Sequence, residues 1–222
     1  MNRFLKPICL GLMLAAAPAG LIVTAPSALA QSASGQSAPG QSTTAQAADP
    51  AAAQIQVFYD ALVASMKSGG TAKSRYDRLR PAVEKVFDLE AMTAAAVGPT
   101  FAAMSDADRK ALVDAFTRMT IANYAKNFDS YGGEKFPVDP QSITRGSERF
   151  VKSRLVPSSG DPVAFNYRLH QVDGNWKVTD VYLAGNISQM AQKRSDFAGT
   201  LKTSGPQGLA KKINALADQT LS

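Results

Sequence analysis

The 222-residue chain is poor in the side chains that most often carry catalysis and metal binding. It has one cysteine, Cys9, and one histidine, His170. A single cysteine cannot close a disulfide within the chain, and a catalytic triad or a Cys/His metal cluster would have to rest on His170. The G-x-x-x-x-G-K-S/T phosphate loop and the H-E-x-x-H motif are also missing. Hydrolase and nucleotide chemistry therefore have no support, and we expect neither a metal nor a cofactor.

The first 30 residues have the layout of a secretory signal peptide. A cationic start containing Arg3 and Lys6 precedes an apolar run, and Ala28-Leu29-Ala30 forms a small-residue cleavage site. The alternative, an uncleaved anchor helix, is disfavoured because Pro18 and Gly20 break an already short run. We expect cleavage after Ala30, which removes the only cysteine together with residues 1–30.

Two further features bound the rest of the chain. Residues 31–48 consist of Gln, Ser, Ala, Gly, Thr and Pro, have no large apolar side chain, and predict a disordered, low-complexity linker. The chain has 24 Lys and Arg against 18 Asp and Glu. That small excess suits an anionic partner or a membrane surface, although solubility explains it equally well, and nucleic acid is not expected behind a signal peptide. Residues 49–222 remain as one domain.

In the first half of this domain, hydrophobic residues recur at three- and four-residue spacing, which predicts helices. The expected boundaries are Asp49-Pro50 and Gly69-Gly70 for the first helix, Tyr76 to Phe87 for the second, Asp88 to Gly98 for the third, and Ser105 to Tyr131 for the fourth. Pro81 lies within the second helix, so we expect a kink there or two shorter helices.

In the second half, the hydrophobic period changes to two, which predicts strands at 142–144, 149–156, 163–172 and 176–183. Further helices follow, with a break at Ser204-Gly205. Alternation in the last strand places Asp180 with Trp176, Val178 and Tyr182 on one face and Val181 with Leu183 on the other. Helices, then antiparallel strands, then helices predict an α+β fold, in which a curved antiparallel sheet packs against N- and C-terminal helices.

Asp180 and the basic clusters each leave two interpretations open, whereas His170 has one favoured interpretation. Asp180 lies among apolar neighbours, where a carboxyl group can act as a base in a small isomerase-like pocket enzyme. It can equally bind backbone amides where its strand leaves the sheet. His170 alternates with Asn166 and Arg168, which indicates a solvated surface histidine. Basic clusters at residues 145–154 and 193–212 are either solvated or contacts for lipid head groups or an acidic partner.

The end of the chain carries a series of short motifs in a particular order. They are W-K-V-T-D-V at 176–181, G-N-I-S at 185–188, R-S-D-F at 194–197 and G-P-Q-G-L at 205–209, preceded by F-T-R-M at 116–119 and by 124–133. This order resembles the MlaC family, also called the toluene-tolerance or periplasmic phospholipid-binding family, over residues 50–220. The additional Asn186 and the linker depart from the family pattern, and the additional Asn186 fits its hopanoid-associated HpnM branch, so the lipid class stays open between phospholipid and hopanoid.

The resemblance implies a periplasmic lipid carrier, not an enzyme, whose sheet and helices enclose an apolar cavity for acyl chains. It further implies shuttling between an outer-membrane lipoprotein/porin complex and an inner-membrane ABC transporter complex with an MCE-type substrate-binding subunit. The candidate lipid-binding residues are Phe101, Phe116, Tyr124, Phe128, Val163, Phe165, Tyr167, Leu169, Val178, Val181 and Leu183. Within this set, the strand 163–172 is the expected wall of the cavity.

Overall fold

The computed structural model describes residues 49–222, so the expected signal peptide (1–30) and linker (31–48) lie outside the described residues. Within this range the elements are α1 (Pro50–Ser68), α2 (Ala72–Val86), α3 (Leu89–Val97), the 3-10 helix η1 (Pro99–Ala103), α4 (Asp106–Asn127), β1 (Ile143–Arg145), β2 (Glu148–Val151), β3 (Arg154–Leu155), β4 (Val163–Val172), β5 (Asn175–Leu183), β6 (Ile187–Ser188) and α5 (Gln189–Leu221). Helices lead, strands follow and helix ends the chain, as expected, and Gly205 (φ 64°, ψ −174°) interrupts α5 where the break at Ser204-Gly205 was expected.

The expected starts of the first, third and fourth helices are confirmed by their capping hydrogen bonds, whereas the second begins at Ala72, four residues before the expected Tyr76. Asp49 accepts from the backbone N–H of Ala51 at 2.8 Å, and Asp88 accepts from the N–H of Ala91 at 2.9 Å. Ser105 caps α4 in the same way. Each cap satisfies a backbone donor that the first turn of the helix leaves without a partner.

Two details of the expected elements are wrong. Pro81 does not divide α2 into two shorter helices, because α2 is one helix from Ala72 to Val86. Its ring is exposed, and packing against α1 and α4 supports the helix despite the missing N–H. The expected strand 149–156 divides into β2 and β3, because Ser153 turns its hydroxyl toward the interior and interrupts the pairing with β4.

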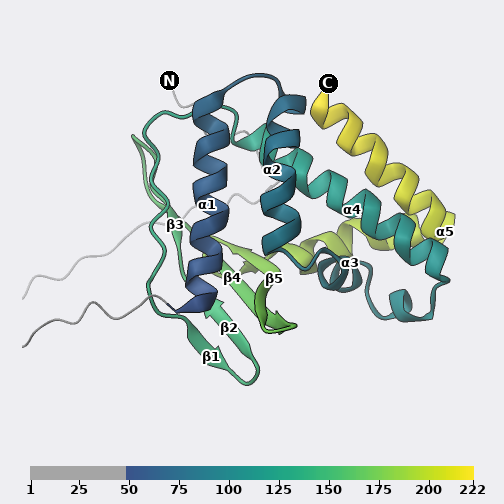
Figure 1. The fold of residues 1–222 in the computed structure, drawn as a ribbon. Helices are drawn as coiled ribbons and strands as arrows, with labels where there is room; N and C mark the ends of the chain where they lie inside the picture. Colours follow the sequence, from purple (N-terminus) through teal and green to yellow (C-terminus); the bar gives the residue numbers. More distant parts are fainter. Residues whose placement is uncertain (1–48) are drawn as a thin grey trace, which may run out of the picture. The chain divides into compact units, whose positions relative to one another are not determined.

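The strands form one antiparallel sheet in the order β1-β2-β4-β5-β6, with β3 also pairing with β4. The β4–β5 hairpin turns at Asp173-Gly174, where both residues have positive φ, as the expected Asp-Gly turn requires. Helix α1 passes across one face of the sheet, and α2 to α5 lie on the same side of the sheet as α1 (Figure 1). The α+β class with helices gathered against one face of the sheet is therefore confirmed.

A β-bulge in β5 decides which residues face the helices. Arg168 pairs with Asp180, but the next residue of β4, Leu169, pairs with Val178, so Thr179 is an extra residue in β5. The alternation restarts after Thr179. Val181 therefore joins Val178 on the inner face, toward the helices, whereas Asp180 turns to the outer face.

The simple alternation expected for this strand is thus wrong beyond Thr179. Tyr182 pairs with Asn166 on the outer face, and Leu183 pairs with Phe165 on the inner face. Val181 and Leu183 at the end of β5 therefore do not require an apolar surface on the outer side of the sheet. They extend the same apolar face that Trp176 and Val178 begin.

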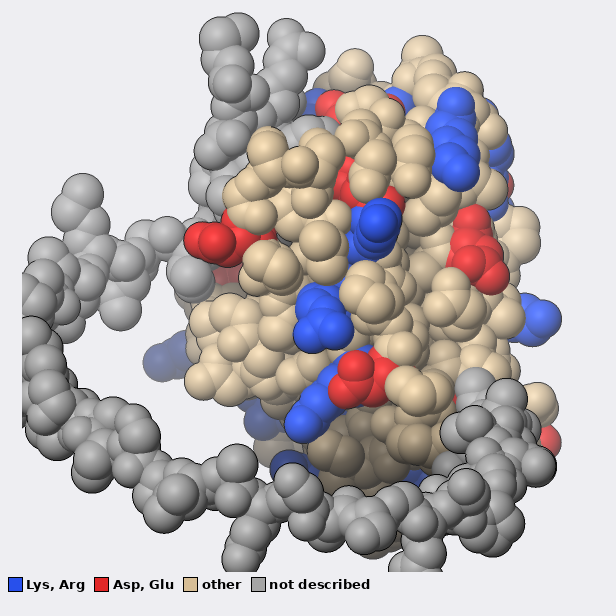
Figure 2. Space-filling model, turned by 90° about the vertical axis from the view of Figure 1, so that its left-hand side faces the viewer, with Lys and Arg blue, Asp and Glu red and all other residues tan. Residues whose placement is uncertain are grey.

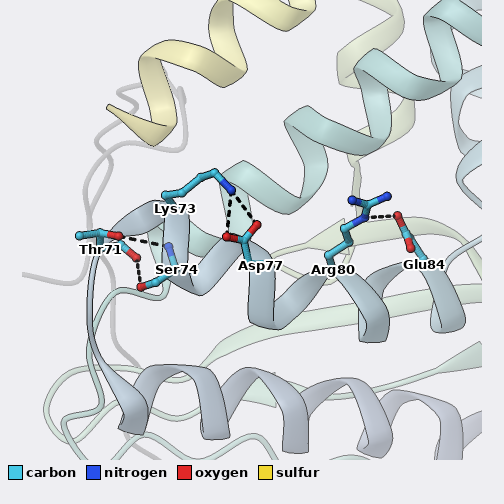
Figure 3. Close-up of polar contacts among 6 residues, drawn as sticks. All are labelled: Thr71, Lys73, Ser74, Asp77, Arg80 and Glu84. Carbon is cyan, nitrogen blue, oxygen red and sulfur yellow. Dashed lines mark hydrogen bonds and ion pairs between the residues drawn. The ribbon is translucent and has the colours of Figure 1, made fainter.

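The helices present polar surfaces away from this core. Helix α2 lies between α1 and α4, and its outer side carries the ion pairs Lys73–Asp77 and Arg80–Glu84, each at 2.8 Å (Figure 3). Exposed pairs at this spacing stabilise a helix by only about 0.3–0.5 kcal/mol each, so they indicate a solvated face. Seen from the left of Figure 1, charged side chains are scattered over a surface built mainly from other residues (Figure 2). No helix within residues 49–222 has the length and hydropathy needed to cross a membrane.

Candidate functional site

The inner face of the sheet is a continuous apolar surface that changes from closed to partly accessible along the strands. Three pairs cross β4 and β5 on this face: Leu169 with Val178, Tyr167 with Val181, and Phe165 with Leu183. The first pair is fully buried, and Tyr167 has no exposed surface. Phe165 and Leu183 are only half-buried, as is Val163 beyond them. The inner face therefore ends in an apolar rim where β4 begins and β5 ends.

Aromatic rings from the helices pack on each other above this face. The ring of Phe58 in α1 lies 5.0 Å from that of Phe87 and 4.9 Å from that of Tyr124 in α4. Tyr124 stacks on Phe128 at 6.1 Å, and Phe128 lies 5.9 Å from Phe136. Such pairs contribute about 0.5–1.5 kcal/mol each beyond the burial of their area. Tyr124 and Phe128 are half-buried, so this cluster, like the sheet, reaches the surface through apolar side chains.

A chain of hydroxyl groups crosses the interior between α1 and the sheet. Tyr167 Oη donates to Tyr59 Oη at 2.9 Å, Tyr59 Oη lies 2.7 Å from Ser153 Oγ, and Ser153 Oγ donates to the carbonyl of Phe165. Ser153 donates its hydroxyl proton to that carbonyl, and Tyr167 donates its own to Tyr59. The hydrogen bond between Tyr59 and Ser153 is therefore donated by Tyr59. Each of these three hydroxyl groups therefore donates its proton to a hydrogen-bond acceptor.

The tyrosines of this region are held neutral by their surroundings. Burial raises the pKa of Tyr59 to about 12, and its hydrogen bonds to Ser153 and Tyr167 offset only part of that effect. Burial also raises the pKa of Tyr167 and of Tyr124, and the proximity of Tyr59 adds to both shifts. An apolar environment disfavours the charged phenolate. These groups are suited to packing against apolar ligands and not to acid–base chemistry near neutral pH.

The structure brings most, but not all, of the candidate lipid-binding residues together. Val163, Phe165, Tyr167, Leu169, Val178, Val181 and Leu183 share the inner sheet face. Tyr124 and Phe128 belong to the aromatic cluster above it. Phe101 lies in η1, and Phe116 packs on Phe197 of α5 with ring centres 6.4 Å apart, both of them buried. Phe116 therefore belongs to the contact between α4 and α5, and Phe101 to η1, which packs beside α3, so neither lies on the inner face of the sheet.

Several residues of this region were absent from the candidate list. Phe58 and Tyr59 come from the inner face of α1, where helical spacing marks Phe58 as a core position. Leu155 packs against the core beside the rim, through its pairing with Val163. Phe136 lies outside any helix or strand, so no periodicity could have indicated it.

Asp180, the residue of the enzyme interpretation, is occupied by structural hydrogen bonds. Its carboxylate accepts from the backbone N–H of Val181 at 2.8 Å, from the N–H of Met190 at 3.1 Å and from Ser188 Oγ at 2.6 Å. The side chain is 3% exposed and points to the outer face. Asp180 thus joins the end of β5 to the start of α5. The expectation that it binds backbone amides where its strand leaves the sheet is confirmed.

His170 lies on the polar outer face, as expected, but it is not simply solvated. It is half-buried, and its Nε2 lies 2.7 Å from Asp88 Oδ2. Asp88 is also the N-cap of α3, so this contact ties β4 to the start of that helix. Within residues 49–222, no group of three or more His, Cys, Asp or Glu side chains is arranged to hold a metal ion.

The fold has a clear counterpart among solved structures. It resembles that of a phospholipid-binding protein from Ralstonia solanacearum, determined in complex with a phospholipid, with a TM-score of 0.67 and 20% sequence identity. The match covers 78% of this chain and 99% of the other. At this identity the likeness establishes the shared fold.

The family follows from the sequence itself. The model of the MlaC protein family matches residues 56–215, which is most of the described domain. The chain therefore belongs to the MlaC family, and the resemblance inferred from its C-terminal motifs is confirmed.

Proposed function

We propose that this protein is a periplasmic carrier that holds the acyl chains of a phospholipid or a hopanoid against the inner face of its sheet. The observation that carries the proposal is the fold shared with a protein whose structure contains a phospholipid. Membership of the MlaC family supports the same function and the periplasmic location. No observation favours the pocket enzyme, because the carboxylate of Asp180 is already engaged by three donors.

The apolar rim is the proposed entrance for the acyl chains. Val163, Phe165 and Leu183 form this rim, and Tyr124 and Phe128 are the half-buried members of the aromatic cluster that packs against the same core. Half-buried apolar side chains can exchange contact with water for contact with lipid. Fully buried residues such as Tyr167 instead form the closed base behind the rim.

The energetics require an assisted release. Two acyl chains contain roughly thirty methylene groups, and burying each contributes ~0.8 kcal/mol, so the gross burial exceeds about 20 kcal/mol. Even after ordering costs, such a ligand will not leave into water. We therefore propose delivery through protein partners, with an outer-membrane lipoprotein/porin complex at one end and an inner-membrane ABC transporter with its MCE-type subunit at the other.

Direct chemical analysis tests the bound ligand. The exported protein, purified without detergent, should yield one equivalent of a lipid on extraction with organic solvent and mass spectrometry. A phospholipid or a hopanoid identifies the class. A protein that is lipid-free when purified and that takes up neither lipid from vesicles would contradict the proposal.

A pair of substitutions tests the rim. Leu183→Asp places a carboxylate on the half-buried inner face, where water can reach it, so the protein should stay folded but lose its lipid. Val57→Asp is the matched control, because Val57 is 41% exposed on α1 and lies outside the rim. Retention of a full equivalent of lipid by folded Leu183→Asp would exclude this rim as the site.

A further inference from the structure

The outer face of the sheet has a composition of its own. Phe150 pairs with Ile143 on one side and with Arg168 on the other, and Arg168 pairs with Asp180, so these four side chains form a row on the outer face. Tyr182 lies on the same face, its ring 6.0 Å from that of Phe150. Ile143 is 40% exposed, so this row presents accessible aliphatic surface beside the two aromatic rings.

Basic side chains surround these apolar groups. Arg145 lies over the ring of Phe150, with its guanidinium carbon 4.6 Å from the ring centre. Arg154 pairs with Ala164 on the outer face, and Lys152 points the same way because Val151 and Ser153 on either side of it point inward. Arg145, Lys152 and Arg154 are exposed, and among residues 49–222 no carboxylate lies within 4 Å of their charged groups.

The acidic groups of this face do not neutralise it. Glu148 is the cross-strand partner of Arg145 and lies 3.8 Å from Arg168, so it offsets part of the charge of both. The exposed Asp139 lies beside Lys152, because its backbone N–H donates to the carbonyl of Lys152 at 2.9 Å. Asp180 is buried and satisfied by three hydrogen bonds, so it contributes little to the outer surface. Arg145, Lys152, Arg154 and Arg168 therefore outnumber the two accessible carboxylates, Glu148 and Asp139, and this excess of positive charge lies beside an exposed aliphatic group and two aromatic rings.

We propose that this outer face, defined by Ile143, Arg145, Phe150, Lys152, Arg154 and Tyr182, docks on the surface of a bilayer that contains anionic lipids. Guanidinium and ammonium groups bind phosphate head groups. Aromatic rings with a polar group or a cation beside them are suited to the boundary between head groups and acyl chains. An acidic protein would complement the cations, but it gives no reason for the exposed Ile143 and the aromatic pair between them.

The location of this face is compatible with lipid carriage. Inner and outer faces are opposite sides of the same strands, so a bilayer held against the outer face leaves the apolar rim uncovered for a protein partner. Docking is a surface property of the folded domain. It does not depend on whether the inner face holds a phospholipid, a hopanoid or no lipid.

Co-sedimentation with vesicles measures this docking. The exported protein should sediment with vesicles of phosphatidylcholine and phosphatidylglycerol, and not with vesicles of phosphatidylcholine alone. Each cation near an anionic membrane surface strengthens binding about fivefold, so the double variant Lys152→Gln/Arg154→Gln should bind about 25-fold more weakly. Added salt should weaken the wild type in the same direction.

Two further variants distinguish binding through the outer face from non-specific attraction caused by the net positive charge of the protein. Lys202→Gln/Lys211→Gln removes the same charge from exposed positions of α5 and should change the partition by less than about twofold. Ile143→Ser keeps every charge and should still weaken binding several-fold, because it removes the exposed apolar contact.

The outcomes separate docking from lipid carriage. If Lys202→Gln/Lys211→Gln in α5 loses as much vesicle binding as Lys152→Gln/Arg154→Gln, the outer face is not the docking surface. The proposal is also overturned if the wild type binds no anionic vesicles, or if it captures only an acidic protein. Extracted lipid, measured in parallel, should be the same in wild type and in Lys152→Gln/Arg154→Gln. A lipid-free wild type that still sediments with anionic vesicles would refute the carrier function and leave docking intact.

Discussion

Replacing Tyr59 by phenylalanine tests the buried hydroxyl chain that ties α1 to the sheet. In the wild type, Tyr59 accepts from Tyr167 at 2.9 Å and lies 2.7 Å from Ser153. Tyr59→Phe removes both hydrogen bonds and leaves the hydroxyl of Tyr167 without an acceptor, in a position with no exposed surface. Tyr167→Phe removes only one bond and leaves no donor without a partner.

The two substitutions therefore differ in cost. A buried hydrogen bond contributes ~1 kcal/mol net, and a buried donor left unpaired costs about 1–3 kcal/mol. Tyr167→Phe should lower the free energy of unfolding by about 1 kcal/mol, and Tyr59→Phe by roughly 2–4 kcal/mol. In the Tyr59→Phe background, Tyr167→Phe removes the unpaired hydroxyl, so it should be neutral or stabilising.

Urea denaturation of the four proteins in this double-mutant cycle gives the coupling energy. Neutral pH keeps every phenol protonated, and the lipid content of each variant must be measured because bound ligand raises the apparent stability. We expect a coupling of at least about 1 kcal/mol between the two positions. Additive effects, or a larger cost for Tyr167→Phe than for Tyr59→Phe, would refute the direction of the chain.

Three further substitutions or conditions test other parts of the fold. Asp180→Ala removes three hydrogen bonds at the junction of β5 and α5, so urea denaturation should show a loss of about 3 kcal/mol. Gly205→Ala should cost about 1–3 kcal/mol, because Gly205 has φ 64° and ψ −174°, which only glycine adopts freely. The matched control Gly199→Ala, within the helical part of α5 and with open space around it, should instead stabilise by up to about 1 kcal/mol; equal effects would contradict the strain. Above pH 10 the phenols of the unfolded chain ionise first, because burial raises the pKa of Tyr59 to about 12 in the folded protein. The free energy of unfolding should therefore fall by about 2 kcal/mol between pH 10 and 12 through Tyr59. Tyrosinate absorbance from Tyr59 should appear only near pH 12 in the native protein, and full ionisation of every tyrosine near pH 10 without unfolding would refute its burial.

Most helix and strand boundaries could be predicted because local chemistry sets them. Capping side chains such as Asp88 and Ser105 satisfy backbone donors within three residues of themselves, and Asp173-Gly174 supplies the turn of its own hairpin. The one-sided pattern of β4 likewise needs only its own residues. The continuity of α2 through Pro81 was missed, since it depends on how that helix packs against α1 and α4.

The candidate site was predicted less completely. The inner-face residues of β4 were identified from alternation, but Tyr167 and Phe165 could not be distinguished, because one is closed over by α1 and the other reaches the rim. Phe136 lies in an irregular segment and carries no periodic signal. Its place beside Tyr59, with ring centres 4.8 Å apart, depends on where α1 meets that segment.

The sequence by itself determined the order of elements, the one-sided face of β4 and the family, since each of these is written in local spacing and in short motifs. Tertiary structure decided the faces of β5. Nothing in the letters around Thr179 marks a bulge, because an extra residue is recognised only by its pairing with β4. That single residue moves Val181 and Leu183 to the inner face and turns Asp180 and Tyr182 outward. Leu183 of the apolar rim and Tyr182 of the docking face owe their sides to it, because sheet pairing, and not the sequence of one strand, sets the side on which each residue lies.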